Sequence, residues 1–341
     1  MPHALPPCKH RPVILGSMFP LVRIVVALVL ALGIAGCSVI SVDLTPRVRP
    51  LEEETVEGRG DAKIVIVELA GVLSDAESAP ILSLGNPPAR VPLLVRLREE
   101  LKKASDDSKV RAVVLRINSP GGTVTASDII YRELMLFRER AHVPIVAALM
   151  DVAASGGYYA ALAADSIVAH PTTITGSIGT IMLTVNAQGL MDKLGLAAVT
   201  VKSGEHKDMG SPFRALTQDE RQMFQSVIDE LHGQFVKLVA ERRRLPRQTV
   251  AQLADGRIYT AEQALQRKLI DAIGYMPDAL AKARSAAGVE EARVVVYKRP
   301  RQYRATYYAK AETGDSAVEA ALAPLAALGA SGPRFLYLWW P

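Results

Sequence analysis

The chain has 341 residues, of which 49% are hydrophobic and 5% aromatic, and its formal net charge is +5. This length and hydrophobic content suit one large or two modest α/β domains and exclude a disordered chain. The basic excess does not indicate a nucleic-acid-binding face, because Lys9, Arg11 and Arg23 supply three positive charges before Cys37 and no acidic residue lies there.

The first residues have the features of an export signal. Arg23 precedes the apolar run 24–35, which is shorter than the roughly 20 residues of a membrane-spanning helix. The run leads into Ile34-Ala35-Gly36-Cys37, which resembles the lipobox of bacterial lipoproteins, where the cysteine thiol is acylated and becomes the first residue. We therefore predict a signal peptide in residues 1–36 and lipidation of Cys37.

Two alternatives stay open for this region. It could be an ordinary signal peptide, or a short anchor with an incidental cysteine, and Met18 could be the true start because the residues after it form a more typical basic n-region. Cys8 lies in the segment that would be removed, so the mature chain would keep a single cysteine and no internal disulfide. Residues 37–61 are predicted to be the lipidated cysteine and a tether, since they contain prolines and a glutamate run without helical or strand periodicity.

A globular domain is predicted over residues 62–300, because strand and helix patterns alternate there. The predicted strands are 63–69, 110–117, 143–149, 166–169 and 293–298. The predicted helices are 91–105, 126–140, 156–164, 217–243, 248–254, 260–266 and 277–287. This order predicts an α/β fold with a largely parallel sheet and a helical C-terminal part. The aromatic C-terminal tail, residues 301–341, is expected to pack on its own domain, a neighbouring subunit or the membrane interface.

Two glycine-rich turns follow buried strands. The first is Asn118-Ser119-Pro120-Gly121-Gly122, and the second begins at Ser155-Gly156-Gly157. The carboxyl ends of parallel strands meet at one edge of a sheet, which brings such turns together. The N–H groups of Gly122 and Gly156 could then form a two-donor oxyanion hole beside a nucleophilic Ser155. The alternative is that both are ordinary tight turns between strand and helix.

A nucleophilic serine needs a base, and the sequence offers two kinds. Of the six histidines, only His206 lies in a loop with other candidate polar groups. A lysine can also serve, because desolvation favours its neutral amine. No His-Glu-x-x-His or Cys-x-x-Cys motif indicates a metal, and no Gly-x-Ser-x-Gly motif is present. The residues alone leave a histidine and a lysine base open.

Several motifs, in order from about residue 62 to residue 274, resemble the bacterial signal peptide peptidase A family. These are Asn118–Gly122, Ala153–Tyr159, Thr175–Gly179, Lys202–Asp208 with Ser211-Pro212, and Asp255–Tyr259 with Ala261–Ala264. The resemblance implies a ClpP/crotonase-like fold and a Ser-Lys dyad without a cofactor or a metal. It matches Ser155 to the nucleophile and Lys207 to the general base, in preference to the competing bases Lys202 and His206. It also matches Gly122 and Gly156 to the oxyanion donors and puts Ser177 where a hydroxyl could orient the lysine amine.

The resemblance implies a serine endopeptidase that cleaves hydrophobic peptides such as remnant signal peptides. Lipidation would hold it on the exported side of a membrane in the bacterial cell envelope. One module carries both Ser155 and Lys207, as in the short form of the family, so we expect a homo-oligomer, an octamer, in which the pair comes from one subunit or from neighbours. The rival hypotheses are a crotonase-like acyl-CoA enzyme, which would need a catalytic carboxylate, and an inactive lipoprotein scaffold.

Overall fold

The computed structural model describes residues 49–75, 91–300, 302, 304–309 and 334–339, which belong to one compact unit, Val48–Pro341. The predicted signal peptide, Cys37 and the first part of the predicted tether lie outside the described residues, as does most of the predicted tail.

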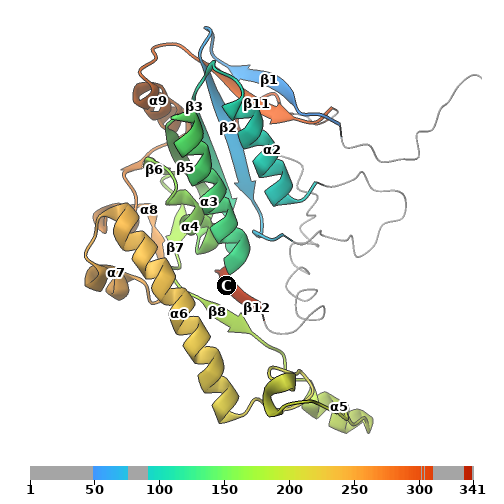
Figure 1. The fold of residues 1–341 in the computed structure, drawn as a ribbon. Coiled ribbons are helices and arrows are strands. Elements are labelled where there is room, and N and C mark those ends of the chain that lie inside the picture. Colours follow the sequence, from blue (N-terminus) through green and yellow to red (C-terminus); the bar gives the residue numbers. More distant parts are fainter. Residues whose placement is uncertain (1–48, 76–90, 301, 303, 310–333, 340–341) are drawn as a thin grey trace, which may run out of the picture. The chain divides into compact units, whose positions relative to one another are not determined.

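A mainly parallel sheet forms the centre of this unit (Figure 1). Among the described residues it has nine strands in the order β1-β11-β2-β3-β5-β6-β10, with β7 paired to β5 and β9 paired to β7. The strands are β1 (Glu52–Glu57), β2 (Lys63–Ala70), β3 (Val110–Ser119), β5 (Ile145–Ala154), β6 (Ser166–Ala169), β7 (Ile174–Gly176), β9 (Ile258–Thr260), β10 (Ala272–Ile273) and β11 (Arg293–Lys298). The pairs from β11 to β10 are parallel, which confirms the predicted α/β class.

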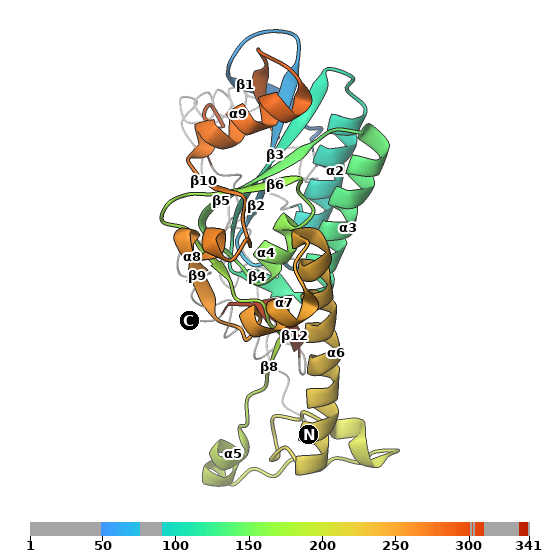
Figure 2. The same cartoon turned by 90° about the vertical axis from the view of Figure 1, so that its left-hand side faces the viewer.

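Helices cover both faces of the sheet. In Figures 1 and 2, α2 (Leu93–Ser105) and α3 (Val124–Ala141) lie on one face and α9 (Met276–Ala287) on the other. Successive β2 residues point to opposite faces, so Val65 packs in the cluster that contains α2 and α3, whereas Ile64 packs with α9. Burial of both faces explains why these strands are continuous apolar runs. Each fully buried leucine or isoleucine side chain contributes about 2 kcal/mol relative to an exposed one.

The remaining helices are α4 (Gly156–Ala161), α5 (Gln188–Leu194), the 3-10 helix η1 (Glu205–Asp208), α6 (Gln218–Arg243), α7 (Arg247–Leu253) and α8 (Ala261–Gln266). Of these, α4, α6, α7 and α8 were predicted from the sequence, whereas α5 and the short helix η1 were not. The long helix α6 begins with a capping box, because the Thr217 hydroxyl accepts a hydrogen bond from the Glu220 N–H at 3.2 Å and the Glu220 carboxylate accepts one from the Thr217 N–H at 3.0 Å. Helix α5 was not predicted and buries none of its residues.

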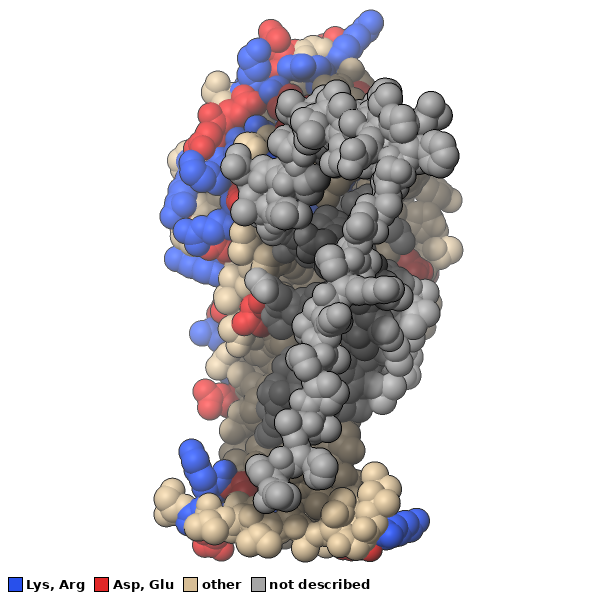
Figure 3. All heavy atoms as spheres, turned by 90° about the vertical axis from the view of Figure 1, so that its right-hand side faces the viewer, with Lys and Arg blue, Asp and Glu red and all other residues tan. Residues whose placement is uncertain are grey.

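Residues 181–215, which we call the arm, extend from β8 (Ile181–Leu183) through α5 and η1. The end of the arm that carries α5 projects away from the main sheet in both ribbon views (Figures 1 and 2). The arm exposes large apolar side chains instead of burying them, and Val199 and Val201 are 88% and 96% exposed. The end of the molecule that carries the arm is mainly uncharged on the face drawn in Figure 3, whereas basic and acidic side chains are interspersed at the opposite end.

A second, three-stranded sheet brings the end of the chain onto its own domain. Its order is β4-β12-β8, with β4 (Gly121–Thr123) and β12 (Arg334–Leu338), and β12 runs antiparallel to both neighbours. The described part of the aromatic tail therefore packs on its own domain, which was the first of the three expected locations.

The prediction of a tether without strand structure up to residue 61 is wrong at Glu52–Glu57, which form β1. Among the described strands it pairs with β11 alone, at the edge of the sheet, so its residues are half-exposed or exposed and show little apolar pattern. Its glutamates are not simply solvated. The Glu53 carboxylate accepts a hydrogen bond from the Lys63 ammonium at 2.7 Å, and Glu54 forms an ion pair with Lys298. A strand stabilised by its charges resembles a solvated charge run in the sequence.

A buried charge cluster joins the strands to the residues after β11. The carboxylate of Glu68, on β2, accepts hydrogen bonds from Arg116 on β3 at 2.6 Å and from Arg304 at 3.2 Å. All three side chains are at most 5% exposed. Burial of two guanidinium groups is tolerated only while a carboxylate lies between them.

Substitution Glu68→Gln removes that charge and leaves Arg116 and Arg304 without their shared counter-ion. We expect a loss of about 3 kcal/mol in the free energy of unfolding, measured from urea denaturation of the purified protein. The matched control is Asp106→Asn at the exposed Lys102–Asp106 pair, which should cost less than about 1 kcal/mol. Equal losses in the two variants would contradict the role given to the buried cluster.

Candidate active site

Ser155 lies in a strained turn between the end of β5 and the start of α4. Its backbone has φ of 51° and ψ of −115°, a conformation that residues other than glycine rarely adopt. The Ser155 N–H donates to the Gly176 carbonyl at 2.7 Å, and its own carbonyl accepts from the Tyr159 N–H at 2.8 Å. Both bonds hold the turn, and a strained strand-to-helix turn is the usual support of a nucleophilic serine in α/β hydrolases.

The hydroxyl of Ser155 is buried and unused by the fold. The residue is 1% exposed, and its Oγ has no hydrogen-bond partner among the described residues. A buried hydroxyl without a partner costs free energy, and such groups in native proteins usually have a catalytic or ligand-binding role. This observation separates Ser155 from a serine that only caps a helix.

The two glycine-rich turns meet, as the sequence predicted. A Cβ added to Gly121 would lie 2.7 Å from the Gly156 backbone nitrogen, and one added to Gly122 would lie 1.9 Å from the Leu73 carbonyl oxygen. A Cβ on Gly156 would lie 2.2 Å from the Ser127 hydroxyl. At Gly121 and Gly122 no other residue type fits without a backbone shift, and at Gly156 the Ser127 side chain would have to move. The close approach puts the Gly156 N–H, which begins α4 and has no partner within the helix, next to β4.

Ser177 lies beside Ser155 at the end of the neighbouring strand. Gly176 pairs with Ala154 in the parallel β5–β7 ladder, so Ser155 and Ser177 each follow a paired residue. Ser177 is 6% exposed and also has a positive φ, of 47°. The structure thus brings together four of the predicted site residues, which are Ser155, Gly122, Gly156 and Ser177.

Among the described residues of one chain, no base forms a hydrogen bond with the Ser155 hydroxyl. Lys207 lies exposed in η1 on the arm, and its ammonium has no hydrogen bond or ion pair to a described residue. The competing bases are engaged elsewhere on the arm and α6: Lys202 donates to the Glu205 carbonyl and the Asp208 carboxylate, both at 2.7 Å, and His206 lies 3.9 Å from Asp219. None of the three forms a hydrogen bond with Ser155.

An ion-pair network that the sequence did not predict joins Asp208, the residue after Lys207, to the first turn of α6. The Arg214 guanidinium donates to Asp208, next to Lys207, at 2.8 Å, and to Glu220 in the first turn of α6 at 2.9 Å. Hydrogen bonds from Arg214 hold the pKa of Asp208 well below its usual range and lower the pKa of Glu220 to about 2. In the sequence, this network is indicated only by the capping-box spacing of Glu220 and the charge of Asp208.

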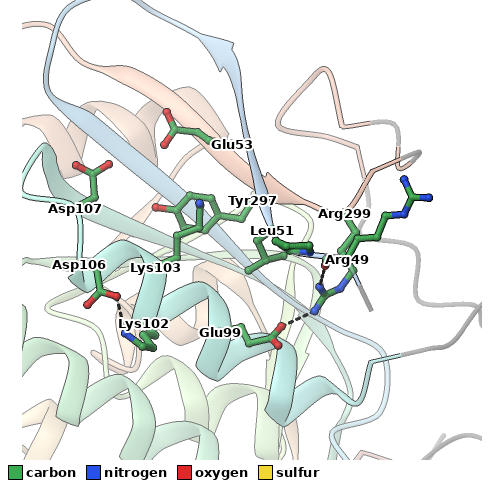
Figure 4. Close-up of a pocket in the computed structure, with 11 residues that line it drawn as sticks. Arg49, Leu51, Glu53, Glu99, Lys102, Lys103, Asp106, Asp107, Tyr297 and Arg299 are labelled. Carbon is green, nitrogen blue, oxygen red and sulfur yellow. Dashed lines mark hydrogen bonds and ion pairs between the residues drawn. The ribbon is translucent and has the colours of Figure 1, made fainter. Parts of the chain in front are cut away.

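A pocket of about 600 Å³ lies away from these residues, between β1, α2 and β11 (Figure 4). Its charged side chains neutralise one another, as in the ion pairs Lys102–Asp106 and Arg299–Glu99. None of the predicted site residues lines it. We therefore place the candidate active site at Ser155 and not in this pocket.

An α/β fold that presents a strained, buried serine beside two convergent glycine turns defines a serine-type hydrolase. Residues 138–290 match Peptidase family S49, and this match contains Ser155, Ser177 and Lys207 but not Gly122. The chain is 36% identical over 247 residues to an assigned signal peptide peptidase SppA of Enterococcus faecium, a match that covers 72% of this chain and 70% of that one. It is 33% identical to the chloroplastic serine protease SPPA of Arabidopsis thaliana, covering 67% of this chain and 33% of that one.

Among solved structures, the chain is similar to the ClpP1 N165D mutant from Listeria monocytogenes, with a TM-score of 0.40 and 15% sequence identity, over 63% of this chain and 94% of that one. The match to the family and the identity to its members show that this chain is a serine peptidase. It belongs to peptidase family S49, the family of the signal peptide peptidases A.

The lowered pKa of Glu220 predicts how the stability of the α6 start depends on pH. A carboxylate whose pKa is lower in the folded state stabilises the fold above its unfolded pKa of about 4.5, and this contribution is lost as the pH falls through the folded pKa of about 2. We therefore expect Glu220→Gln to lower the unfolding midpoint in urea at pH 7, and the difference from the parent protein to shrink steadily between pH 4.5 and pH 2. A difference that is independent of pH would contradict the assigned role of the ion pairs.

Proposed function

We propose that this serine peptidase cleaves hydrophobic peptides, such as remnant signal peptides, by a Ser155–Lys207 dyad. The observation that carries the proposal is the buried Oγ of Ser155, which has no partner among the described residues and lies in a strained turn beside Gly122 and Gly156. A hydroxyl held in this way is available to a peptide carbonyl and to a base, and the fold makes no other use of it.

In the proposed reaction, the neutral amine of Lys207 takes the proton of Ser155 Oγ as that oxygen attacks the peptide carbonyl carbon. The N–H groups of Gly122 and Gly156 stabilise the negative charge on the carbonyl oxygen of the tetrahedral intermediate. Lys207 returns the proton to the leaving amine, and the peptide bond breaks to give an acyl-enzyme. Water then attacks this ester with Lys207 as base, which releases the carboxylate product and restores Ser155.

We infer that a second copy of the chain supplies the lysine. Lys207 is exposed on the arm and forms no hydrogen bond with Ser155 of its own chain. The same arm exposes Leu190, Leu194 and Val201, which are 60%, 63% and 96% exposed. Exposed apolar surface of this kind marks an interaction site, and packing against another copy would also desolvate the amine, which favours the uncharged form that a base requires. A ring of copies, such as the predicted octamer, repeats this contact.

A lipid on Cys37 would hold the enzyme at a membrane on the exported side of the bacterial cell envelope, close to hydrophobic segments left there after export. The support is the order of basic residue, apolar run and small residues before Cys37. Among the residues that the structure describes, no helix is long and apolar enough to cross a membrane.

The decisive experiment measures cleavage of a hydrophobic signal peptide by the Ser155→Ala and Lys207→Ala variants. Each alone should lose at least about 1,000-fold in kcat/KM, because removal of one member of a catalytic unit disables the unit. Lys202→Ala is the matched control, since its amine lies on the same arm and is bonded to Asp208. Full activity in Ser155→Ala would end the proposal of a serine peptidase site at this position.

Co-assembly of the two inactive variants tests which chain supplies the lysine. If lysine and serine come from neighbours, mixed oligomers should regain about a quarter of the parent activity, because half of the serines are intact and half of their neighbours carry the lysine. Mixed oligomers that form and stay inactive would show that each chain uses its own Lys207.

Substitution Cys37→Ala should remove the lipid. We expect the full-length variant to move from the membrane fraction to the aqueous phase, and mass spectrometry of the parent protein to show an acylated N-terminal Cys37. An intact N-terminus on membrane-bound protein would contradict the lipoprotein assignment.

A further inference from the structure

Strand β5, which leads to the candidate nucleophile, has extra residues relative to the neighbouring strand β3. In the first part of the ladder the two strands pair in a regular parallel register that ends with Ile117 opposite Leu149. The next pair is Ser119 with Ala153, so one residue of β3 lies opposite three residues of β5. We call residues 150–152 the β5 bulge. Bulges bend a strand and are common beside active sites, where they redirect a side chain.

The bulge determines which residue of the first glycine-rich turn lies level with Ser155. Counting on from the pair Ser119–Ala153 puts Ser155 level with Gly121. If the register before the bulge continued, the serine would lie two residues further along, about 7 Å from that level. The close approach of Gly121 to the Gly156 backbone nitrogen agrees with the register that the bulge produces.

Strand β5 also changes its neighbour on the other side at the bulge. Its first part pairs with β6, and its last part pairs with β7, where Val152 lies opposite Ile174 (Figure 1). The last residue of β7, Gly176, accepts the hydrogen bond from the Ser155 N–H. No single ladder therefore runs along the whole of β5, and its register at the change of neighbour depends on additional contacts.

Two side chains supply those contacts. The Thr173 hydroxyl, which is 0% exposed, donates to the Leu149 carbonyl at 3.0 Å and also to the Met150 carbonyl, so that one hydroxyl holds the start of the bulge. The Asn118 Oδ1 atom accepts a hydrogen bond from the Val152 N–H at 3.1 Å, at the end of the bulge. Backbone groups inside a sheet need partners, and at a bulge the ladder does not provide all of them.

Asn118 also joins the bulge to the turn that carries Gly122. Its backbone pairs with Ala70 in β2, and its carbonyl accepts a hydrogen bond from the Gly71 N–H at 3.1 Å. Because this backbone is held by β2, the side-chain bond to Val152 sets the distance between the first glycine-rich turn and the strand that carries the serine.

We propose that Thr173 and Asn118 are positioning residues of the peptidase, which hold the β5 bulge in the register that brings Ser155 level with the first glycine-rich turn. The inference rests on the proposed function, cleavage at Ser155. Both residues act through β5 and not on the reacting atoms. When either contact is lost, β5 relaxes at the bulge and Ser155 moves relative to Gly122 and Gly156. A displacement of about 1 Å can cost about 100-fold in rate.

The first test measures kcat and KM of the full-length assembled protein with a hydrophobic signal peptide. Thr173→Val removes the hydroxyl, and we expect kcat to fall at least about tenfold with KM nearly unchanged, because the variant misplaces the nucleophile and not the peptide. Thr173→Ser keeps a hydroxyl and should restore most of kcat. A substitution that only weakened the fold would leave kcat of the folded protein as in the parent.

The matched control is Tyr158→Phe, which also removes a buried hydroxyl that donates to a backbone carbonyl, that of Leu269 at 2.7 Å, outside β5. It should keep the parent kcat. Parent kcat in Thr173→Val, together with an inactive Ser155→Ala variant, would overturn the inference and leave the proposed function intact. Full activity in Ser155→Ala would instead end the proposed function.

The second test asks whether the two side chains act through the same bulge. Asn118→Leu removes the acceptor of the Val152 N–H and should also lower kcat. Because either change releases the bulge, the double variant with Thr173→Val should lose much less than the product of the two single losses. Losses that multiply would contradict a shared action through the bulge.

Hydrogen exchange keeps the inference testable without any cleavage. Mass spectrometry would follow amide exchange of the segment 149–155 in the full-length Ser155→Ala protein. Adding Thr173→Val should speed this exchange at least about tenfold, because the bulge opens more often, whereas adding Tyr158→Phe should not change it. Unchanged exchange with Thr173→Val would refute the role of this hydroxyl whether or not the protein is a peptidase.

Discussion

The close approach of two glycine turns at one end of the parallel sheet is the constraint on which the site depends. A Cβ on Gly121 would overlap the Gly156 backbone nitrogen, so the turns after β3 and β5 can approach this closely only because Gly121 is a glycine. Gly122 and Gly156 lie equally close to the Leu73 backbone and the Ser127 hydroxyl. The meeting of the two turns positions backbone N–H groups beside Ser155. The bond from the Ser155 N–H to Gly176 then holds the serine in its strained conformation, with its hydroxyl unused by the fold.

Among the residues that the structure describes, no base lies at Ser155, and this separation has a physical basis. The sheet and its turns carry Ser155, Ser177 and the proposed oxyanion donors Gly122 and Gly156. Lys207, the proposed base, lies on an arm that buries little of its own apolar surface. The network of Arg214 with Asp208 and Glu220 holds Lys207 near the start of α6, and not near Ser155. In the proposed mechanism, another copy of the chain brings its lysine to this serine, so an oligomer would be a condition for activity.

Much of the fold could be predicted because the long strands and helices carry strong periodicity. The apolar runs of β2 and β3 and the capping box at Thr217 are signals of this kind. The missed strands have other causes. β4, β7, β8 and β9 span three residues each and β10 spans two, which is too few for a period, and β1 is stabilised by ion pairs at a sheet edge. The position of β12 beside Gly122 could not be predicted, because it depends on a pairing between residues more than 200 positions apart.

The most direct test of the central claim, that Ser155 is the nucleophile and Lys207 its base, is covalent labelling by a serine-directed fluorophosphonate. The full-length assembled protein is treated with the probe, digested and analysed by mass spectrometry. We predict a single phosphonylated serine, Ser155, with labelling lost in Lys207→Ala and kept in Lys202→Ala. Labelling of a different serine, or an unlabelled Ser155 in a preparation that cleaves peptides, would contradict it.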